Sequence, residues 1–297
     1  MNYERFIFFI VCLIISMVIY RFFSNKIILG TYKPYPEINI KNKPTKVKGY
    51  IGIIRHGTRY PTKNVFKQLS PDMKDKLSHQ KIGELHVKGM QEMYDYGRYL
   101  SNTYPNIFSR PENIKVFSTK MNRSIDSAKE CVKGLNMEGY INIEYNDNIE
   151  SFLKLKNILK EKTDHNPYQM RCQFADALDL TIPSYCGLLN YSKNYIKKNR
   201  DTYKSIVKTH EKGYPFYHIL LDLIAEYKKY SIEQGCLFFC HDSTLAPIYY
   251  LFKLLPDIDQ YNNEDWLPFA ARLEIIITKN NNVHFFVNDK LIRVEYN

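Results

Sequence analysis

The folded region of this chain opens with Ile53-Ile54-Arg55-His56-Gly57-Thr58-Arg59-Tyr60-Pro61-Thr62, which continues an apolar run that begins at residue 50. Such a run is typical of a buried strand, so two arginines, a histidine and a glycine fall at a strand end. Arginine presents a planar fork of donors that matches phosphate oxygens, and glycine lets the backbone turn closely around a ligand. Histidine can act as a nucleophile near neutral pH. These residue types predict a phosphate site with a histidine nucleophile.

The same stretch resembles the Arg-His-Gly-x-Arg-x-Pro signature of the histidine acid phosphatases, with Arg55, His56 and Arg59 at the defined positions. The longer form Arg-His-Gly-Thr-Arg-Tyr-Pro-Thr is most similar to the multiple inositol polyphosphate phosphatases. The alternative is a basic surface turn, since an isolated Arg-His-Gly is a weak signal. The resemblance therefore depends on whether the family's other motifs follow downstream in the same order.

A second apolar strand is predicted at residues 114–117, and it leads through Ser118-Thr119-Lys120 into a helix that carries Arg123 in its first turn. The first turn of a helix has backbone N–H groups without intrahelical partners and a dipole that favours anions. These elements form a second candidate anion site, and the resemblance places the family's third phosphate-binding arginine at Arg123. The alternative is an arginine that only contacts solvent.

A third apolar strand, residues 236–240, is followed directly by His241 and Asp242 and by a predicted helix to residue 255. The pair resembles the His-Asp motif of the acid phosphatases, whereas the multiple inositol polyphosphate phosphatases usually carry His-Ala-Glu here. The resemblance implies that His241 contacts the phosphoryl group and that Asp242 donates a proton to the leaving alcohol. The alternative is a structural histidine beside an aspartate that caps a helix.

Gly83-Glu84-Leu85-x-x-x-Gly89 leads into a predicted helix that ends at Tyr104-Pro105, because apolar and small residues recur at spacings of three and four. Its buried stripe is predicted to consist of Met90, Met93, Tyr94, Gly97 and Leu100. The stretch resembles the family's Gly-x-Leu-Thr-x-x-Gly helix but carries His86 where threonine is usual. We expect a structural role for His86, since a lone histidine seldom acts without a partner.

The chain has 297 residues and a formal net charge of +11. Residues 1–50 hold eight Lys and Arg against two acidic residues, which leaves only +5 for the rest of the chain. This mildly basic remainder is compatible with polyanionic substrates. A nucleic-acid partner is not favoured, because no basic stripe with interleaved aromatic residues stands out.

Residues 6–20 form an apolar run flanked by Arg5 and Arg21, close to the ~20 residues that span a bilayer. We expect residues 1–24 to be an uncleaved signal-anchor, because bulky residues follow the run where a cleavage site requires small ones. A cleaved signal peptide is the close alternative, and either one places the protein in the secretory pathway, membrane-anchored or secreted. Residues 25–48 are polar and interrupted by prolines, which is typical of an extended stalk.

Cysteine usage fits that compartment only in part. Cys172 and Cys186 flank a short polar segment and are the best disulfide candidates. The resemblance to the inositol phosphatases, which carry cysteines in a similar Cys-x-Phe and Pro-x-x-Cys context, supports this pair. Cys236 and Cys240 lie on one face of the third strand and cannot readily bridge each other. For Cys131, pairing with either of them and a free thiol both stay open, as do three buried reduced cysteines.

The order of elements predicts an α/β fold over residues 49–297, and the resemblance implies a doubly wound, phosphoglycerate-mutase-like sheet. Each apolar strand leads into a polar loop and a helix, so the candidate residues meet at the carboxyl ends of the strands. Residues from about 145 to 230 are predicted to be a helical insertion that caps one side of the site, with a glycosylation candidate at Asn190. Residues 275–278 and 283–287 are predicted to form a C-terminal β-hairpin.

The resemblance implies a phosphomonoester hydrolase that forms a phosphohistidine on His56 and needs no metal or other cofactor. The equatorial phosphate oxygens are expected to contact Arg55, Arg59, Arg123 and His241. Asp242 is expected to act first as an acid and then as a base, which predicts an acidic pH optimum. This arrangement requires the imidazoles of His56 and His241 to lie within about 10 Å of each other.

The expected partner is a small-molecule phosphomonoester. The resemblance favours inositol polyphosphates, with 2,3-bisphosphoglycerate as a further candidate, and Lys63 is expected to contact a second phosphate. The enzymatic alternative is a broad-specificity acid phosphatase or a Golgi sugar-phosphate phosphatase, because the His-Asp pair and the anchor fit those relatives. The non-enzymatic alternative is a membrane-tethered module that binds a phosphate ligand without turnover.

Overall fold

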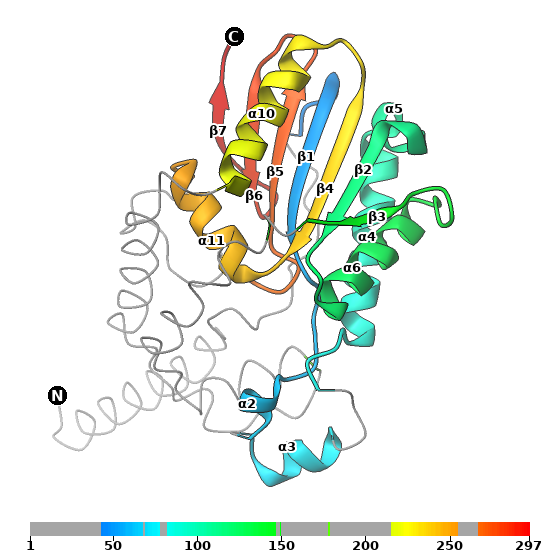
Figure 1. The fold of residues 1–297 in the computed structure, drawn as a ribbon, viewed down its shortest axis with the longest axis vertical. Helices are drawn as coiled ribbons and strands as arrows, with labels where there is room; N and C mark the ends of the chain where they lie inside the picture. The colour runs from blue at the N-terminus through cyan, green and yellow to red at the C-terminus, as the bar shows by residue number, and fades with distance from the viewer. Residues whose placement is uncertain are drawn as a thin grey trace, which may run out of the picture.

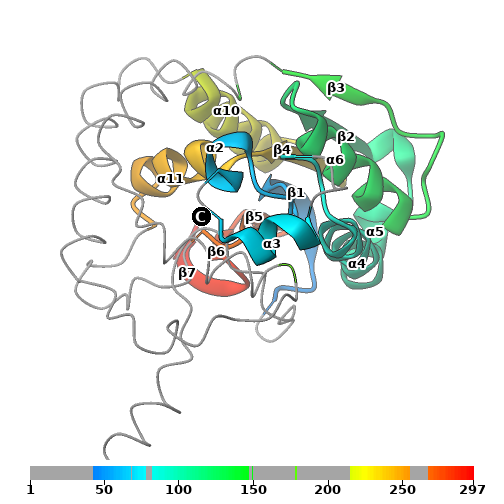
Figure 2. The same ribbon diagram turned by 90° about the horizontal axis from the view of Figure 1, so that it is seen from below.

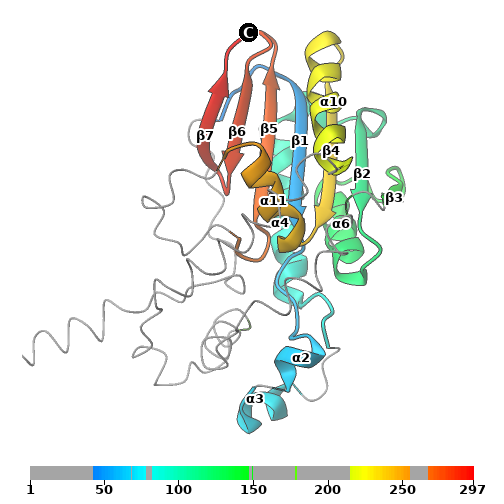
Figure 3. The same ribbon diagram turned by 60° about the vertical axis from the view of Figure 1, so that its left-hand side comes forward.

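The computed structural model describes residues 43–67, 69–77, 82–146, 149, 178, 215–254 and 267–297. The described residues build a seven-stranded sheet in the order β3-β2-β4-β1-β5-β6-β7 (Figure 3). Its strands are β1 (Val47–Arg55), β2 (Ile114–Ser118), β3 (Ile143–Tyr145), β4 (Gln234–Cys240), β5 (Arg272–Thr278), β6 (Val283–Val287) and β7 (Lys290–Glu295). The first four strands in this order run parallel, and β5, β6 and β7 each run antiparallel to the strand before them.

Helices cover both faces of the sheet (Figures 1 and 3). One face carries α4 (Val87–Thr103), α5 (Pro105–Phe108) and α6 (Asn122–Gly134), and the other carries α10 (Pro215–Lys229) and α11 (Asp242–Leu251). The 3₁₀ turn η1 (Pro111–Asn113) precedes β2. Two short helices, α2 (Lys63–Phe66) and α3 (Pro71–Lys76), lie beyond the carboxyl ends of the parallel strands, and Figure 2 looks onto them. The predicted doubly wound α/β fold is therefore confirmed.

Strand β1 lies between β4 and β5 and is buried along its whole length. A strand that is covered on both faces is apolar on both, which explains why its sequence is a continuous apolar run. Ile51 and Ile53 face the core beneath α10 and α11, while Tyr50 and Ile54 face the core beneath α4 and α6. The residues that follow β1 therefore start from a rigid base.

The predicted helical insertion, residues 145–230, is too long at both ends. Residue 145 closes β3, and the last part of the range forms α10. Helix α10 packs on the sheet with Phe216, Leu220 and Tyr227 buried, so it belongs to the main core and not to a cap. Helical periodicity indicates an apolar face but does not say which surface that face covers. The rest of the predicted insertion lies outside the described residues.

The predicted C-terminal hairpin is also incomplete. The structure adds β7 to it, so three antiparallel strands follow one another. The chain reverses between β6 and β7 at Asn288 and Asp289, whose φ angles are 47° and 65°. Asparagine and aspartate enter this left-handed region more readily than other residues that carry a Cβ, which suits a two-residue turn between antiparallel strands.

The buried side of α4 differs in part from the predicted stripe. The prediction is confirmed for Met93, Gly97 and Leu100, which are buried, whereas Tyr94 is only half-buried. Met90, in contrast, is 37% exposed, and Tyr96 and Tyr99 are buried instead. The two tyrosine rings lie 4.5 Å and 5.9 Å from the guanidinium carbon of Arg272. This side of the helix therefore packs on a buried cation of the sheet, which its aromatic rings attract.

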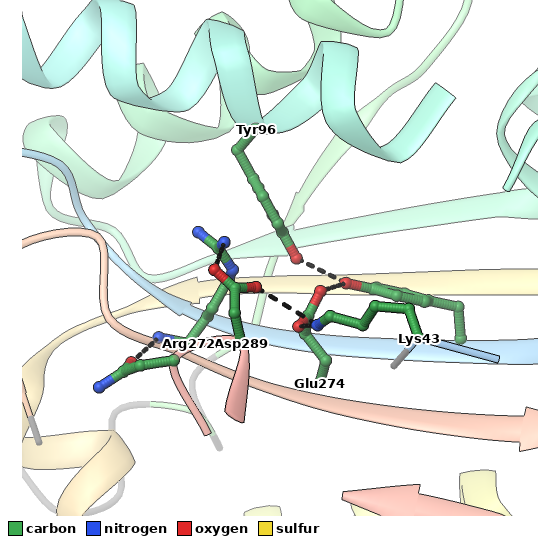
Figure 4. A network of polar contacts seen from close by, with 7 residues as sticks. Lys43, Tyr96, Arg272, Glu274 and Asp289 are labelled. Atoms are coloured by element: carbon green, nitrogen blue, oxygen red, sulfur yellow. Dashed lines mark hydrogen bonds and ion pairs between the residues drawn. The ribbon is translucent and has the colours of Figure 1, made fainter. Parts of the chain in front are cut away.

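A buried network of charged side chains joins the start of the described domain to its C-terminal strands (Figure 4). It consists of two cations and two anions: Lys43, Arg272, Glu274 and Asp289. Lys43 pairs with Glu274 and lies 3.3 Å from Asp289, which pairs with Arg272 at 2.6 Å. The Tyr50 hydroxyl donates to Glu274 and lies 2.8 Å from the hydroxyl of Tyr96.

Because its charges balance and share hydrogen bonds, this network leaves no buried ion uncompensated. The network also shows that the predicted stalk, residues 25–48, is too long at its C-terminal end. Lys43 is buried in the network and Val47 begins β1, so the folded domain extends further toward the N-terminus than predicted.

Several predictions concern residues outside the described part: the membrane segment 1–24, the disulfide Cys172–Cys186 and the glycan at Asn190. Within the described part, no helix is both long and apolar enough to cross a membrane. Membrane attachment, the secretory pathway, the disulfide and the glycan therefore stay predictions. The other three cysteines that we considered, Cys131, Cys236 and Cys240, are buried free thiols.

Helices α4 and α6 approach each other closely through glycines. A Cβ at Gly97 would lie 2.1 Å from the carbonyl oxygen of Cys131, and one at Gly134 would lie 2.0 Å from that of Tyr94. Both obstacles are backbone atoms, which cannot move away unless the helices separate. Since α6 also carries Arg123, this contact sets the position of a candidate site residue.

We expect Gly97→Ala to lower the free energy of unfolding by about 1–3 kcal/mol, the usual cost of overpacking a filled interior. Thermal and denaturant unfolding followed by circular dichroism measure this change. Arg98→Ala is the matched control, because Arg98 is exposed on the same helix and its loss should change stability by less than about 0.5 kcal/mol. Equal effects of the two substitutions would contradict the close approach of the helices.

Candidate active site

Three loops meet at the carboxyl ends of β2, β4 and β1, which are neighbours in the sheet. Strand β1 leads into His56, β4 leads into His241, and β2 leads into Thr119. Backbone hydrogen bonds extend the pairing into the loops: the N–H of His56 donates to Cys240 O at 3.0 Å, and that of Thr119 to Phe239 O at 3.1 Å. Parallel strands therefore bring together residues that are distant in the chain.

His56 is buried, and its ring centroid lies 5.4 Å from that of His241, which meets the requirement set by the sequence hypothesis. Its Nδ1 is 2.9 Å from the carbonyl oxygen of Gly57. A carbonyl oxygen can only accept, so Nδ1 carries the proton and Nε2 keeps a lone pair. Burial, followed by the charges of Arg123 and Arg55, lowers the pKa of His56 well below its ordinary value. The ring therefore stays neutral in mildly acidic solution.

The loop after β1 holds two buried arginines, Arg55 and Arg59. Nη1 of Arg55 donates to the carbonyl oxygen of Leu267 at 2.8 Å, and its Nη2 lies 3.3 Å from a carboxylate oxygen of Asp242. Nη1 of Arg59 donates to the carbonyl oxygen of Tyr60 at 2.8 Å. Two buried guanidinium groups close together at the end of one strand favour an anion at this place.

Arg123, in the first turn of α6, reaches the same group of side chains. Its Nη2 lies 3.4 Å from Nδ1 of His241. Because a guanidinium can only donate, Nδ1 of His241 accepts, and its Nε2 donates to the hydroxyl of Thr119 at 3.1 Å. Ser127 connects α6 to the loop after β1: its hydroxyl accepts from the N–H of Gly57 at 3.1 Å and donates to the Arg123 carbonyl at 2.7 Å.

Asp242 is the first residue of α11, and His241 occupies the capping position before it, so Asp242 is not the helix cap. Its carboxylate accepts from the N–H of Ser243 at 2.8 Å. Burial raises the pKa of Asp242, but Arg55 and His241 lower it by more, so that its pKa lies below its ordinary value. The carboxyl group is therefore ionised near neutral pH. About a third of the side chain, 31%, is exposed, which leaves Asp242 accessible to solvent.

The loop after β1 is held against α4 by contacts that the sequence reasoning missed. A Cβ at Gly57 would lie 2.5 Å from the carbonyl oxygen of Gly89, so the two backbones touch only because both residues are glycine. The carboxylate of Glu92 accepts from the N–H of Thr58 at 2.7 Å and from its hydroxyl at 2.8 Å. Its sequence signal is faint: Glu92 follows Gly89 by three residues and so shares its face of the helix.

Two predicted residues lie apart from this group. Lys63 is the first residue of α2 and its side chain is exposed, so its contact with a second phosphate stays a prediction. His86 precedes α4, and its Nδ1 accepts from the N–H of Lys88 at 3.1 Å. Its ring also meets that of Tyr60 at 4.8 Å. His86 therefore has the structural role that we expected.

This geometry can be compared with known proteins. The family model of the histidine phosphatase superfamily (branch 2) matches residues 46–212, which is more than half of the chain. The chain belongs to this superfamily. The resemblance of the motifs is therefore confirmed, and this histidine phosphatase is a phosphoric monoester hydrolase. The non-enzymatic alternative, a binding module without turnover, is not supported.

Solved structures with this fold include the phytase from D. castellii, at a TM-score of 0.59 and 13% identity, covering 92% of this chain and 79% of that one. A multiple inositol polyphosphate phosphatase from Bifidobacterium longum, in complex with inositol hexasulfate, has a TM-score of 0.53 and 13% identity over 90% of this chain and 93% of that one. The phytase from Klebsiella sp. ASR1 has a TM-score of 0.54 and 13% identity over 84% and 83%. At such identities the likeness shows the fold alone. No curated protein matches the sequence of this histidine phosphatase significantly.

We expect Glu92→Gln to lower the turnover of p-nitrophenyl phosphate about tenfold. An amide accepts through one terminal atom only, so one donor of Thr58 loses its partner, at a cost of about 1–3 kcal/mol. Initial rates of the purified proteins measure the effect. Glu130→Gln on α6 is the matched control, because Glu130 only faces Lys133 at 3.8 Å near the surface. Unchanged rates for Glu92→Gln would contradict the role of this carboxylate in holding the loop.

Proposed function

We propose that this enzyme hydrolyses phosphomonoesters of inositol polyphosphates through a phosphohistidine on His56. One observation carries the proposal: His56 is buried and neutral, with its proton on Nδ1, among the guanidinium groups of three arginines. Positive surroundings attract a phosphate dianion, while the unprotonated Nε2 can still form a bond to phosphorus. The proposed roles of the other residues follow from their chemistry and from their contacts in the same group of side chains.

In the first step, Nε2 of His56 attacks phosphorus, and the bond between phosphorus and the ester oxygen breaks. The proton of Asp242 passes to that oxygen, so the alcohol leaves neutral and Asp242 becomes a carboxylate. The equatorial oxygens are held by Arg55, Arg59 and Arg123, whose charge and donors stabilise the transition state, and His241 contacts the same phosphoryl group. The step leaves a phosphorus–nitrogen bond on His56, and Nδ1 keeps its proton on the Gly57 carbonyl.

In the second step, water attacks the same phosphorus atom, and the carboxylate of Asp242 takes a proton from it. The phosphorus–nitrogen bond breaks, and its electron pair returns to Nε2 of His56. Inorganic phosphate leaves, with Asp242 protonated and His56 neutral, as at the start. The hydrogen bond to Gly57 keeps the ring in one tautomer during both steps.

Asp242 is ionised in the site without substrate, so substrate binding has to favour its protonation. A phosphate dianion on Arg55 competes with Asp242 for that guanidinium and brings negative charge close to the carboxylate. Both effects raise the pKa of Asp242 in the complex. A lower pH favours the same protonation, while the depressed pKa of His56 keeps the nucleophile neutral. The raised pKa of Asp242 in the complex and the lowered pKa of His56 together predict an acidic pH optimum for turnover.

We expect His56→Ala to lower turnover by at least about 10³-fold, because the covalent intermediate cannot form. Rapid quenching of the wild type in alkaline detergent, with a ³²P-labelled monoester, should trap a label that is stable in alkali and lost in acid. The variant should still bind inorganic phosphate in calorimetry, which shows that the arginines are in place. Substantial turnover by His56→Ala, or a label that survives acid, would contradict this role.

We expect kcat/KM to rise as the pH falls below neutral, and Asp242→Asn to remove this rise. Asparagine has no proton to give, so hydrolysis of β-glycerophosphate should fall by about 10²-fold or more. Hydrolysis of p-nitrophenyl phosphate should fall much less, because its leaving group needs no proton. pH–rate profiles with both substrates measure this. An alkaline optimum of the wild type, or equal losses on both substrates, would show that Asp242 is not the acid.

The substrate class is supported by charge and by the structural neighbours. One neighbour is a phytase and another was solved with inositol hexasulfate. Three arginines around one histidine suit a substrate that carries several phosphates. A broad-specificity acid phosphatase, acting on simple or sugar monoesters, is the second candidate. Asp242 favours it, because the inositol phosphatases that the sequence resembles carry Ala-Glu after the histidine.

We expect kcat/KM for phytate to exceed that for glucose 6-phosphate by about tenfold or more, the value of one additional charge-assisted contact. Initial rates under equal conditions measure the ratio. Lys63→Met should reduce the ratio and leave the rate on glucose 6-phosphate unchanged, because Lys63 is proposed to contact only a second phosphate, which glucose 6-phosphate lacks. A ratio of one or less would favour the broad-specificity enzyme.

A further inference from the structure

Phe269 lies next to the candidate active site, although it is distant in the chain from Arg55, His56 and Arg59, which its ring contacts. The guanidinium carbon of Arg55 lies 4.6 Å from the centre of its ring, and that of Arg59 lies 5.8 Å from it. The ring of His56 is 5.9 Å away. One buried aromatic ring therefore meets both arginines of the first loop and the histidine between them.

The face of an aromatic ring attracts a guanidinium without neutralising it. A carboxylate in the same place would also hold the arginines, but its charge would oppose a bound phosphate. A ring face takes no hydrogen bond from a carboxylate or carbonyl partner and adds no negative charge. It can therefore hold the two arginines without cancelling their positive charge.

The backbone around Phe269 is joined to the same residues. The carbonyl oxygen of Leu267 accepts from Nη1 of Arg55 at 2.8 Å, and that of Ala271 accepts from the backbone N–H of Arg55 at 2.8 Å. The N–H of Ala270 donates to the carbonyl oxygen of His56 at 3.1 Å. Ala270 has a φ of 59°, a conformation that is unfavourable for a residue with a Cβ. The turn adopts it while it pairs with the strand end that carries the nucleophile.

The ring also packs within a small apolar cluster. Its buried members besides Phe269 are Val65, Leu69, Met73, Leu77 and Leu178. Most of them belong to α2, α3 and the segment between these helices, which lie beyond the carboxyl ends of the strands. Packing of the short helices therefore limits the movement of the ring, and the ring limits the movement of the arginines.

We propose that Phe269 is a positioning residue of this phosphatase, and that its ring holds Arg55 and Arg59 in the orientation that binds the transferring phosphate. The inference rests on the proposed function of these arginines. It assigns Phe269 an effect on phosphate affinity, which a residue that only fills the core would not have.

The test replaces Phe269 by ring-fluorinated phenylalanines through site-specific incorporation, up to pentafluorophenylalanine. These side chains keep the shape of the ring and weaken the attraction of its face for cations. We expect the dissociation constant of inorganic phosphate, measured by calorimetry, to rise with each added fluorine and to reach about tenfold for the full substitution. KM should rise in parallel. Phe269→Leu should show the same loss of affinity together with a lower melting temperature.

Phe108 provides the matched control, because it is equally buried and its ring meets that of Tyr50 at 5.1 Å. It lies at the other end of the sheet, next to Gly235 near the start of β4. Fluorinated rings at Phe108 and Phe108→Leu should change the melting temperature only. Phosphate affinity that is equally insensitive to both positions would overturn the inference and leave the proposed function intact. A wild type that neither binds phosphate nor turns over monoesters would overturn both.

Discussion

A cluster of three arginines, gathered where three parallel strands end, is the constraint on which the rest of the structure depends. Arg55, Arg59 and Arg123 act together on His56, and Arg55 also faces the carboxylate of Asp242. Backbone carbonyls, hydrogen-bonded loops and an aromatic ring hold the guanidinium groups in position, where their positive charge favours an anionic ligand. The same charges depress the pKa of His56, so the electrostatics that suit phosphate also keep the nearby imidazole neutral.

The protein buries charge in a second place, with a different outcome. In the network of Lys43, Arg272, Glu274 and Asp289 the charges are equal in number and neutralise one another (Figure 4). That network joins the first described residues to the C-terminal strands and has no charge left for a ligand. Burial of ionisable groups therefore does not by itself distinguish a functional site here; arginines gathered around two histidines at the ends of the strands do.

Much of the site could be predicted from short motifs. Arg55, His56 and His241 each lie at or just after the end of an apolar strand, and parallel strands that are neighbours end at the same edge of a sheet. The supporting residues could not be predicted in this way. Glu92 acts across the gap between a helix and a loop, and Phe269 acts through the face of its ring, so neither produces a pattern in the chain. Periodicity likewise identifies the apolar face of a helix but not the surface that this face covers. The sequence therefore assigned α10 to a cap, whereas α10 packs on the sheet.

The amino-acid sequence was sufficient for the fold class, the chemical character of the site and the family, because strand–loop–helix order and residue type are properties of short stretches. The tertiary structure was needed to show that His56 carries its proton on Nδ1, that Asp242 faces Arg55 at 3.3 Å, and that one ring lies under two arginines. Tautomers, pKa values and cation–π contacts depend on distances of a few ångströms between side chains. Those distances exist only after segments from opposite ends of the chain have packed around the same sheet.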